Sequence, residues 1–160
     1  MPALSDITTD MHAISEAGYG GVCFDVEETV GSSSELVPAF QKAFAAAKSS
    51  GLTVQVTTSH SAPYQADSAS VAVDLVTAWC ADGNIDEISP QLYSSGSETS
   101  PEFDATASCA SEGCTWDLYE NCTAKFVPSL VDSTHLAPTQ SYFSSIFGIE
   151  VEGYYQWAQA

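Results

Sequence analysis

Two carboxylates at the end of a short apolar segment have the type and spacing for acid–base chemistry. Asp25 and Glu27, separated by one residue, follow Val22, Cys23 and Phe24. Because side chains two positions apart in a strand project from the same face, both carboxylates are expected on the face that carries Cys23. Burial and a neighbouring charge both disfavour ionisation, and a carboxyl group that stays protonated near neutral pH can act as a general acid.

The same carboxylates have a simpler interpretation. Asp25, Glu27 and Glu28 would then only begin a solvated loop of a very acidic protein, because charged strand ends are common. A perturbed pair of carboxylates indicates a functional site only with some probability. The spacing by itself does not decide between the two interpretations.

The elements that must position these residues alternate along the chain. Apolar residues at helical spacing predict helices over residues 5–17, 35–50, 68–80 and 139–147. Runs of apolar and β-branched residues predict five strands, over residues 22–24, 52–58, 85–93, 125–131 and 149–157. Ser34 is the expected N-cap of the helix over 35–50. Such alternation indicates βαβ units and a parallel sheet.

Length and composition restrict what the protein can be. The 160 residues suffice for one domain, over residues 1–160, but a complete (β/α)8 barrel typically needs about 250. With 21 acidic residues, three lysines and no arginine, the formal net charge is -18, which argues against nucleic acid or an anionic membrane surface as partner. No stretch approaches the roughly 20 apolar residues of a membrane span.

A Ser-, Glu- and Cys-rich segment, over about residues 94–122, is expected to be a loop insertion around a helix, held by disulfides. Three of its cysteines and a fourth nearby form an even set with three possible pairings: Cys80, Cys109, Cys114 and Cys122. Cys23 is expected to be a buried free thiol. Trp116 and Tyr119 would either extend a ligand cleft or pack the insertion itself.

The cysteines also bear on the compartment. Asn121-Cys122-Thr123 fits the N-glycosylation sequon and, together with disulfides, favours an oxidising, secretory history. A signal-peptide pattern is absent from the first residues, so a natural amino-terminal part is expected to be missing. His12, His60 and His135 lack ligand spacing, and neither a metal nor a cofactor is expected.

The stretch from Gly18 to Glu28 resembles the fourth-strand signature of family 18 glycoside hydrolases, the chitinase family, written D-G-x-D-x-D-x-E. Gly21, Asp25 and Glu27 match this signature, whereas Gly20 and Cys23 stand where two further aspartates are usual. The resemblance implies that Glu27 is the general acid. It also implies that Asp25 orients the acetamido group of the substrate, which itself acts as the nucleophile.

Later strand ends add to the resemblance. Plant-type and fungal endochitinases often carry an Ala-Pro run after the fifth strand, Gln-x-Tyr after the sixth and Trp after the eighth. Here Ser61-Ala62-Pro63-Tyr64, Gln91-Leu92-Tyr93 and Tyr155-Gln156-Trp157 follow successive predicted strands. The resemblance therefore extends over nearly the whole chain and implies strands four to eight of a (β/α)8 TIM barrel, an α/β fold.

These strand ends supply the parts of a sugar site. Trp157 would offer a flat apolar floor to a pyranose ring, and Gln91 and Tyr93 would hydrogen-bond around the acetamido group. In the family the tyrosine stabilises the oxazolinium intermediate, and Tyr64 is counted among the substrate-binding residues. The alternative for Trp157 is an ordinary core tryptophan, since this residue is usually highly buried.

Two functions follow from the resemblance. The first is hydrolysis of β-1,4-linked N-acetylglucosamine polymers with retention of configuration. The second is a chitinase-like binding or structural protein without turnover, which Gly20 and Cys23 in place of acids would suit. Because five parallel strands cannot close a barrel, the chain is expected to be part of a longer polypeptide or to be completed by a partner chain.

Overall fold

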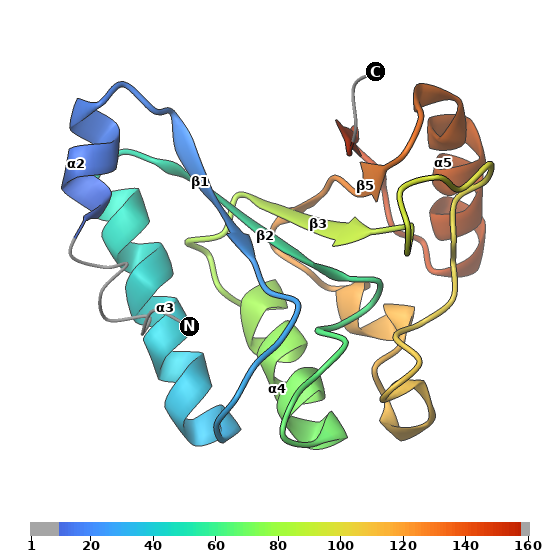
Figure 1. The fold of residues 1–160 in the computed structure, drawn as a ribbon, viewed down its shortest axis with the longest axis horizontal. Coiled ribbons are helices and arrows are strands. Elements are labelled where there is room, and N and C mark those ends of the chain that lie inside the picture. The colour runs from blue at the N-terminus through green and yellow to red at the C-terminus, as the bar shows by residue number, and fades with distance from the viewer. Residues whose placement is uncertain (1–9, 158–160) are drawn as a thin grey trace.

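Parallel strands form a curved sheet with helices along its outer side (Figure 1). This computed structural model describes residues 10–157. The strand order is β1-β2-β3-β5-β6, β4 also pairs with β3, and every pairing is parallel. The strands are β1 (Gly21–Asp25), β2 (Thr53–Ser59), β3 (Glu87–Gln91), β4 (Lys125–Phe126), β5 (Ser129–Leu130) and β6 (Tyr155–Gln156). The helices are α2 (Met11–Glu16), α3 (Ser33–Ser49), α4 (Ala69–Cys80) and α5 (Leu136–Ile146).

The predicted α/β class with a parallel sheet is confirmed. The first predicted helix, over residues 5–17, is seen as α2, and its residues before position 10 lie outside the described part of the chain. The N-cap of α3 is Ser32 rather than Ser34. Glu35 explains the difference, because its Oε2 accepts hydrogen bonds from the Ser32 backbone N–H at 3.1 Å and hydroxyl at 2.7 Å.

The carboxyl-terminal third has shorter strands than predicted. The strand over 125–131 is divided into β4 and β5, with Val127 and Pro128 between them; proline has no N–H to give to a ladder. The last strand is reduced to β6, and Val151 makes only an isolated bridge to Phe126. The insertion has two short 3-10 helices, η1 (Ala110–Glu112) and η2 (Trp116–Tyr119), in place of the expected α-helix.

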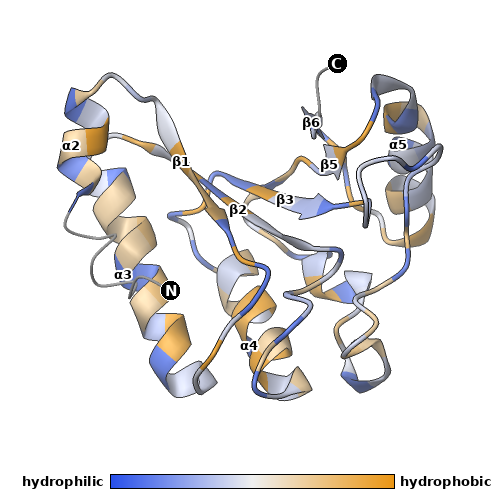
Figure 2. Ribbon diagram, viewed as in Figure 1, coloured by the Kyte–Doolittle hydropathy of each residue, from blue (hydrophilic) through white to orange (hydrophobic). Residues whose placement is uncertain are grey.

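The core lies between the outer face of the sheet and the helices. Phe24 of β1 meets Phe44 of α3 edge to face, with ring centroids 5.0 Å apart. On the other side Phe143 of α5 contacts Trp116 and Phe126, with centroids 5.1 and 4.7 Å away. Figure 2 shows apolar residues along β1 and β2 and the helices that cover them. Trp116 is buried in this cluster and packs the insertion.

The cysteines form two disulfides, Cys80–Cys122 and Cys109–Cys114. The first ties the end of α4 to the end of the insertion, and the second closes a five-residue step within it. Cys23 is free, as expected, but it is exposed, so the prediction of a buried thiol is wrong. Its side chain is on the concave face of the sheet, which the helices of the described residues do not cover.

Ion pairs lie at the amino ends of the strands. Lys48 contacts Asp86 at 2.7 Å, and Asp86 also accepts a hydrogen bond from the Val54 backbone at 2.8 Å. Lys125 pairs with Glu152 at 3.0 Å. Between residues 10 and 157 no helix has the length and apolar character that crossing a bilayer requires.

Candidate functional site

The predicted site residues follow the carboxyl ends of neighbouring strands, on the concave face. The register places Asp25 beside Thr57, and Thr57 beside Ser89. Two residues further along the strands, Gln91 lies between Ser59 and Ser129. Because facing residues of paired strands point to the same side of a sheet, these positions form two polar rows across the concave face.

The carboxylate pair is present as predicted. Asp25 is exposed on this face and Glu27 is half-buried. Partial burial and the charge of Glu27 both raise the pKa of Asp25 above its usual value. The effect acts on Asp25, the residue expected to orient the substrate.

The backbone after β1 is fixed by the loop after β2. The Gln65 N–H donates to the Glu27 carbonyl at 3.3 Å, and the Thr29 N–H donates to the Gln65 carbonyl at 2.9 Å. Next to this bridge, the exposed Tyr64 hydroxyl donates a hydrogen bond to Glu28, which raises the pKa of Tyr64. Tyr64 therefore contacts the acidic segment through Glu28, a partner that the sequence analysis had counted only as a loop residue.

Tyr93 and Trp157 are brought together. Their ring centroids are 5.5 Å apart with planes at 33°. Trp157 is 59% exposed, so the alternative of a core tryptophan is wrong for this residue. Tyr93 is buried, and burial together with the charges of Asp25 and Glu27 raises its pKa to about 12. The phenol thus stays protonated at neutral pH and remains a hydrogen-bond donor next to the carboxylate pair.

Gln91 is 8% exposed. By the register of β3 it points to the same side as Ser59 and Ser129, and no hydrogen bond of its side-chain amide to another described residue is found. The role of Gln91 in holding a substrate stays a prediction.

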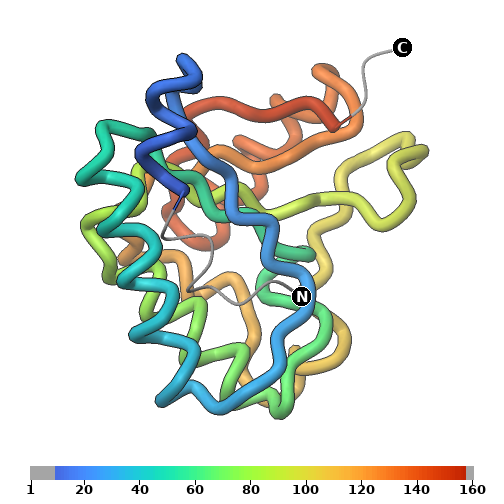
Figure 3. Tube along the Cα trace, turned by 60° about the vertical axis from the view of Figure 1, so that its left-hand side comes forward, coloured from blue at the N-terminus to red at the C-terminus, as the bar shows by residue number. Residues whose placement is uncertain are grey.

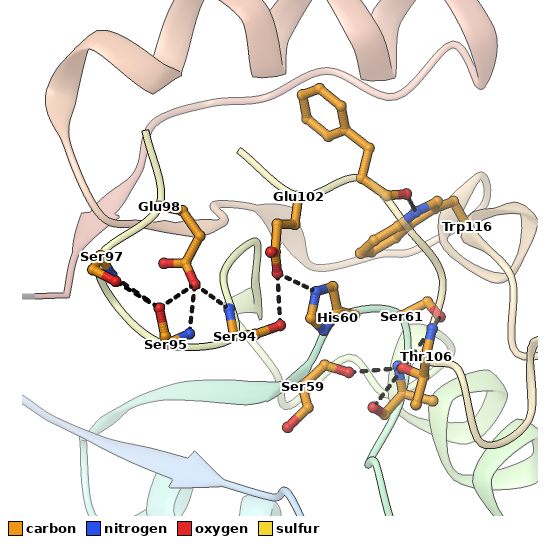
Figure 4. A network of polar contacts seen from close by, with 12 residues as sticks. Ser59, His60, Ser61, Ser94, Ser95, Ser97, Glu98, Glu102, Thr106 and Trp116 are labelled. Carbon is orange, nitrogen blue, oxygen red and sulfur yellow. Dashed lines mark hydrogen bonds and ion pairs between the residues drawn. The ribbon is translucent and has the colours of Figure 1, made fainter. Parts of the chain in front are cut away.

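A loop after β3, over residues 94–102, was not predicted as part of the site. Figure 3 shows it, in yellow-green, extending outward from the end of β3. Its Glu98 carboxylate accepts hydrogen bonds from the backbones of Ser94 and Ser95, and Glu102 contacts both Ser94 and His60 (Figure 4). His60 is thus an anchor of the loop, its side chain 17% exposed. The signal in the sequence was Ser94-Ser95-Gly96, a turn-forming run followed by an acid.

Cys23 has the environment of an inert thiol. Although the residue is exposed, partial burial of the thiol and the charge of Asp25 raise its pKa to about 11, so it is neutral at pH 7, unlike the aspartate usual at this place in the signature. Tyr155 of β6 donates a hydrogen bond to Glu87 on the same face, and this bond raises its pKa to about 12. On the concave face near Asp25, the Cys23 thiol and the Tyr155 phenol are therefore neutral, and the Glu87 carboxylate accepts a hydrogen bond from Tyr155.

Two surface hollows lie beyond the concave face. One, of about 350 Å³, lies between α5 and the segment before β6, lined by Gln140, Ser144 and Ile149. It holds none of the predicted site residues. A smaller one, of about 150 Å³, adjoins Tyr64. In the described part of the chain no three His, Cys, Asp or Glu side chains form a group that could hold a metal ion.

Comparisons with protein-family models, curated proteins and solved structures found no match for this chain.

Proposed function

We propose that the protein is a chitinase-like glycoside hydrolase that acts on β-1,4-linked N-acetylglucosamine polymers through substrate-assisted, retaining catalysis. The observation that carries the proposal is the placement of Tyr93. The charges of Asp25 and Glu27 act on this buried phenol, whose ring packs at a tilt against the exposed Trp157. A donor, a carboxylate pair and an aromatic floor then face one bound sugar. The proposal takes the curved sheet as strands four to eight of a TIM barrel.

The roles follow from these positions. Glu27 protonates the glycosidic oxygen as the bond to C1 breaks, and the acetamido oxygen of the same sugar bonds to C1 to form an oxazolinium ion. Asp25 orients the acetamido N–H, and Tyr93 donates a hydrogen bond to the acetamido oxygen. Water then attacks C1, Glu27 accepts its proton, and the acetamido group is restored. Two displacements at C1 retain the configuration.

The raised pKa of Asp25 supports this scheme. Burial and the charge of Glu27 disfavour ionisation of Asp25, and a proton that Asp25 retains lies on the neighbour of the proposed general acid. Trp157 has the accessibility that binding requires, and Tyr64 lies beside the acidic segment through Glu28.

Substitution of Glu27 tests the chemistry. Glu27→Gln keeps the size of the side chain and removes the acid, so hydrolysis of N-acetylglucosamine oligomers should fall at least about 100-fold. Glu112→Gln, an exposed position in η1, is the matched control and should retain full activity. Circular dichroism of both variants checks that the fold is kept. An unchanged rate in Glu27→Gln would contradict the proposal.

A second function is favoured by one observation. The neutral thiol of Cys23 occupies the place of an acid, so a site that binds oligosaccharides without turnover is the alternative. Titration with N-acetylglucosamine oligomers, followed by product analysis, separates the two functions. Binding with no released product supports the binding or structural protein, including one that a partner chain completes, and steady release of product excludes it.

We also propose a secreted location. The two disulfides are consistent with an extracellular protein, because such bonds persist in oxidising compartments. Asn121 of the sequon is exposed at a turn, where a glycan would meet no obstruction from buried neighbours. Expression in a eukaryotic secretory host should give a mass shift that is lost in Asn121→Gln.

A further inference from the structure

We propose that the loop over residues 94–102 sets the orientation of Trp157, with Gly96 and Glu98 as positioning residues. The contact itself is a property of the fold. Its consequence for saccharide binding rests on the function proposed above. Three features carry the inference: the close approach of Gly96 to the indole, the packing of Trp157 on Tyr93, and the hydrogen bonds that hold the loop.

Gly96 lies against the pyrrole edge of Trp157. A Cβ atom added at Gly96 would be 2.5 Å from Nε1 and 2.7 Å from Cδ1 of the indole. Neither approach is tolerable, so any side chain at this position must displace the ring or the loop. The φ of Gly96 is +80°, a conformation that glycine adopts at little cost. Both observations make this position specific for glycine.

The indole is thereby fixed on two sides. Tyr93 packs on its ring at 5.5 Å between centroids, and Gly96 covers its Nε1 edge. With 59% of the residue still exposed, much of the indole surface remains open. A platform held in one orientation binds a sugar ring without the entropy cost of ordering it on contact.

Hydrogen bonds keep the loop in the shape that presents Gly96. Partial burial opposes ionisation of Glu98, but the hydrogen bonds from Ser95 and Ser94 outweigh it and lower the pKa of Glu98 to about 2. The carboxylate therefore spans the turn around Gly96 at all ordinary pH values (Figure 4). At the loop end, the Glu102 N–H donates to the Leu92 carbonyl at 2.9 Å.

The Glu102 side chain ties the same loop to β2. Its Oε2 accepts a hydrogen bond from the Ser94 hydroxyl at 2.6 Å and lies 3.2 Å from Nε2 of His60. His60 follows β2 directly, so the loop is connected to a strand that is paired on both sides, with β1 and β3. Glu98 thus stabilises the shape of the loop through Ser94 and Ser95, and Glu102 connects the loop to the sheet through His60.

The decisive variant is Gly96→Ala, compared with Gly51→Ala as control. Gly51 has a φ of +78°, nearly that of Gly96, but an added Cβ meets no atom within 4 Å there. Both variants therefore suffer the same backbone strain, and only Gly96→Ala meets the indole. Glu98→Gln tests the brace, because the amide oxygen keeps the shape of the acceptor and loses its charge.

Tryptophan fluorescence reads the position of Trp157 without any ligand. Trp79 and Trp116 are 1% and 3% exposed, so acrylamide quenching of the native protein reports mainly Trp157. We expect a changed quenching constant in Gly96→Ala, a smaller change in the same direction in Glu98→Gln, and no change in Gly51→Ala. Equal quenching in Gly96→Ala and Gly51→Ala would overturn the inference.

Kinetics with N-acetylglucosamine oligomers then test the consequence. Gly96→Ala should raise KM about three- to tenfold, the value of an aromatic contact, and leave kcat within about twofold. A fall in kcat alone, with KM unchanged, would overturn the positioning role in binding. If quenching changes as expected but the native protein neither binds nor cleaves the oligomers, the proposed function fails and the role of the loop in placing Trp157 stands.

Discussion

The Tyr64 hydroxyl donates a hydrogen bond to the Glu28 carboxylate, linking the loop after β2 to the loop after β1. Glu28 adjoins Glu27, and the Gln65 N–H next to Tyr64 donates to the Glu27 carbonyl. The residue proposed as general acid is therefore held by contacts from a neighbouring strand end. We expect this hydrogen bond to fix the position of Glu28 and to add little to the stability of the fold, because both side chains are exposed.

Tyr64→Phe separates these two effects. Removing the hydroxyl leaves the ring in place, so the unfolding midpoint should hardly change, whereas hydrolysis of N-acetylglucosamine oligomers should fall about two- to tenfold as Glu28 is released. Tyr19→Phe is the control, since Tyr19 is exposed and precedes β1, at the opposite end of the strand from the loop that holds Glu28. A large loss of stability in Tyr64→Phe would show that the link is structural instead.

Asp25→Asn should stabilise the protein at pH 7 and abolish its activity. The folded state raises the pKa of Asp25, so its contribution to stability is present below the unfolded pKa and is lost as pH rises through the folded value. At neutral pH the ionised Asp25 is therefore a cost that asparagine avoids. Thermal unfolding at pH 7 and pH 3 checks this: the gain should appear at pH 7 and vanish at pH 3. Stabilisation of equal size at both pH values would contradict the ionic explanation.

The two disulfides should differ in their contribution to stability. Cys80–Cys122 joins residues 42 apart and Cys109–Cys114 joins residues five apart. The loop-entropy model gives about 4 kcal/mol for the longer closure and about 2 kcal/mol for the shorter one. Denaturant unfolding of Cys80→Ser/Cys122→Ser and of Cys109→Ser/Cys114→Ser measures both. A larger loss for the shorter bridge would show that strain or packing dominates over chain entropy.

Phe143 should be the most sensitive position of α5. It is fully buried among aromatic rings, and Phe143→Ala is expected to lower the free energy of unfolding by about 3–5 kcal/mol. Ile146 lies on the same helix but is 58% exposed, so Ile146→Ala should change stability by less than about 0.5 kcal/mol. Urea denaturation gives both values, and similar losses in the two variants would place the core elsewhere.

Much of the fold was predictable because its signals are local. The strands that became β1, β2 and β3 and the helices α3 and α4 lie close to the predicted ranges, since apolar periodicity and capping residues mark them. The division of the predicted strand over 125–131 could have been predicted from Pro128, because proline has no N–H to donate to a neighbouring strand. The shortness of β6 could not have been predicted, since the β-branched and aromatic residues over 149–157 suit a longer strand. Its length is limited by the few residues that pair with β5.

The site was predictable where motifs marked it and not where loops form it. The sequence names four of the candidate residues: Asp25, Glu27, Tyr93 and Trp157. In the structure Tyr93 packs against Trp157, and the charges of Asp25 and Glu27 raise the pKa of Tyr93. The contact of Gly96 with Trp157 was out of reach, because it depends on the path of a loop rather than on periodicity. The exposure of Cys23 was missed because the residues around it in β1 are apolar and indicate a buried strand. In the structure Cys23 lies on the concave face of the sheet, where it is exposed.

The scarcity of lysine described above has a consequence for protease sensitivity. Trypsin requires lysine or arginine, and the sequence has no arginine and only three lysines. Lys42 and Lys48 lie within α3, and Lys125 begins β4. Cleavage needs an extended, locally unfolded chain, which none of these positions offers in the native state. Trypsin should therefore leave the folded domain intact, and the rate at which it cuts will report how often the helix and sheet themselves open.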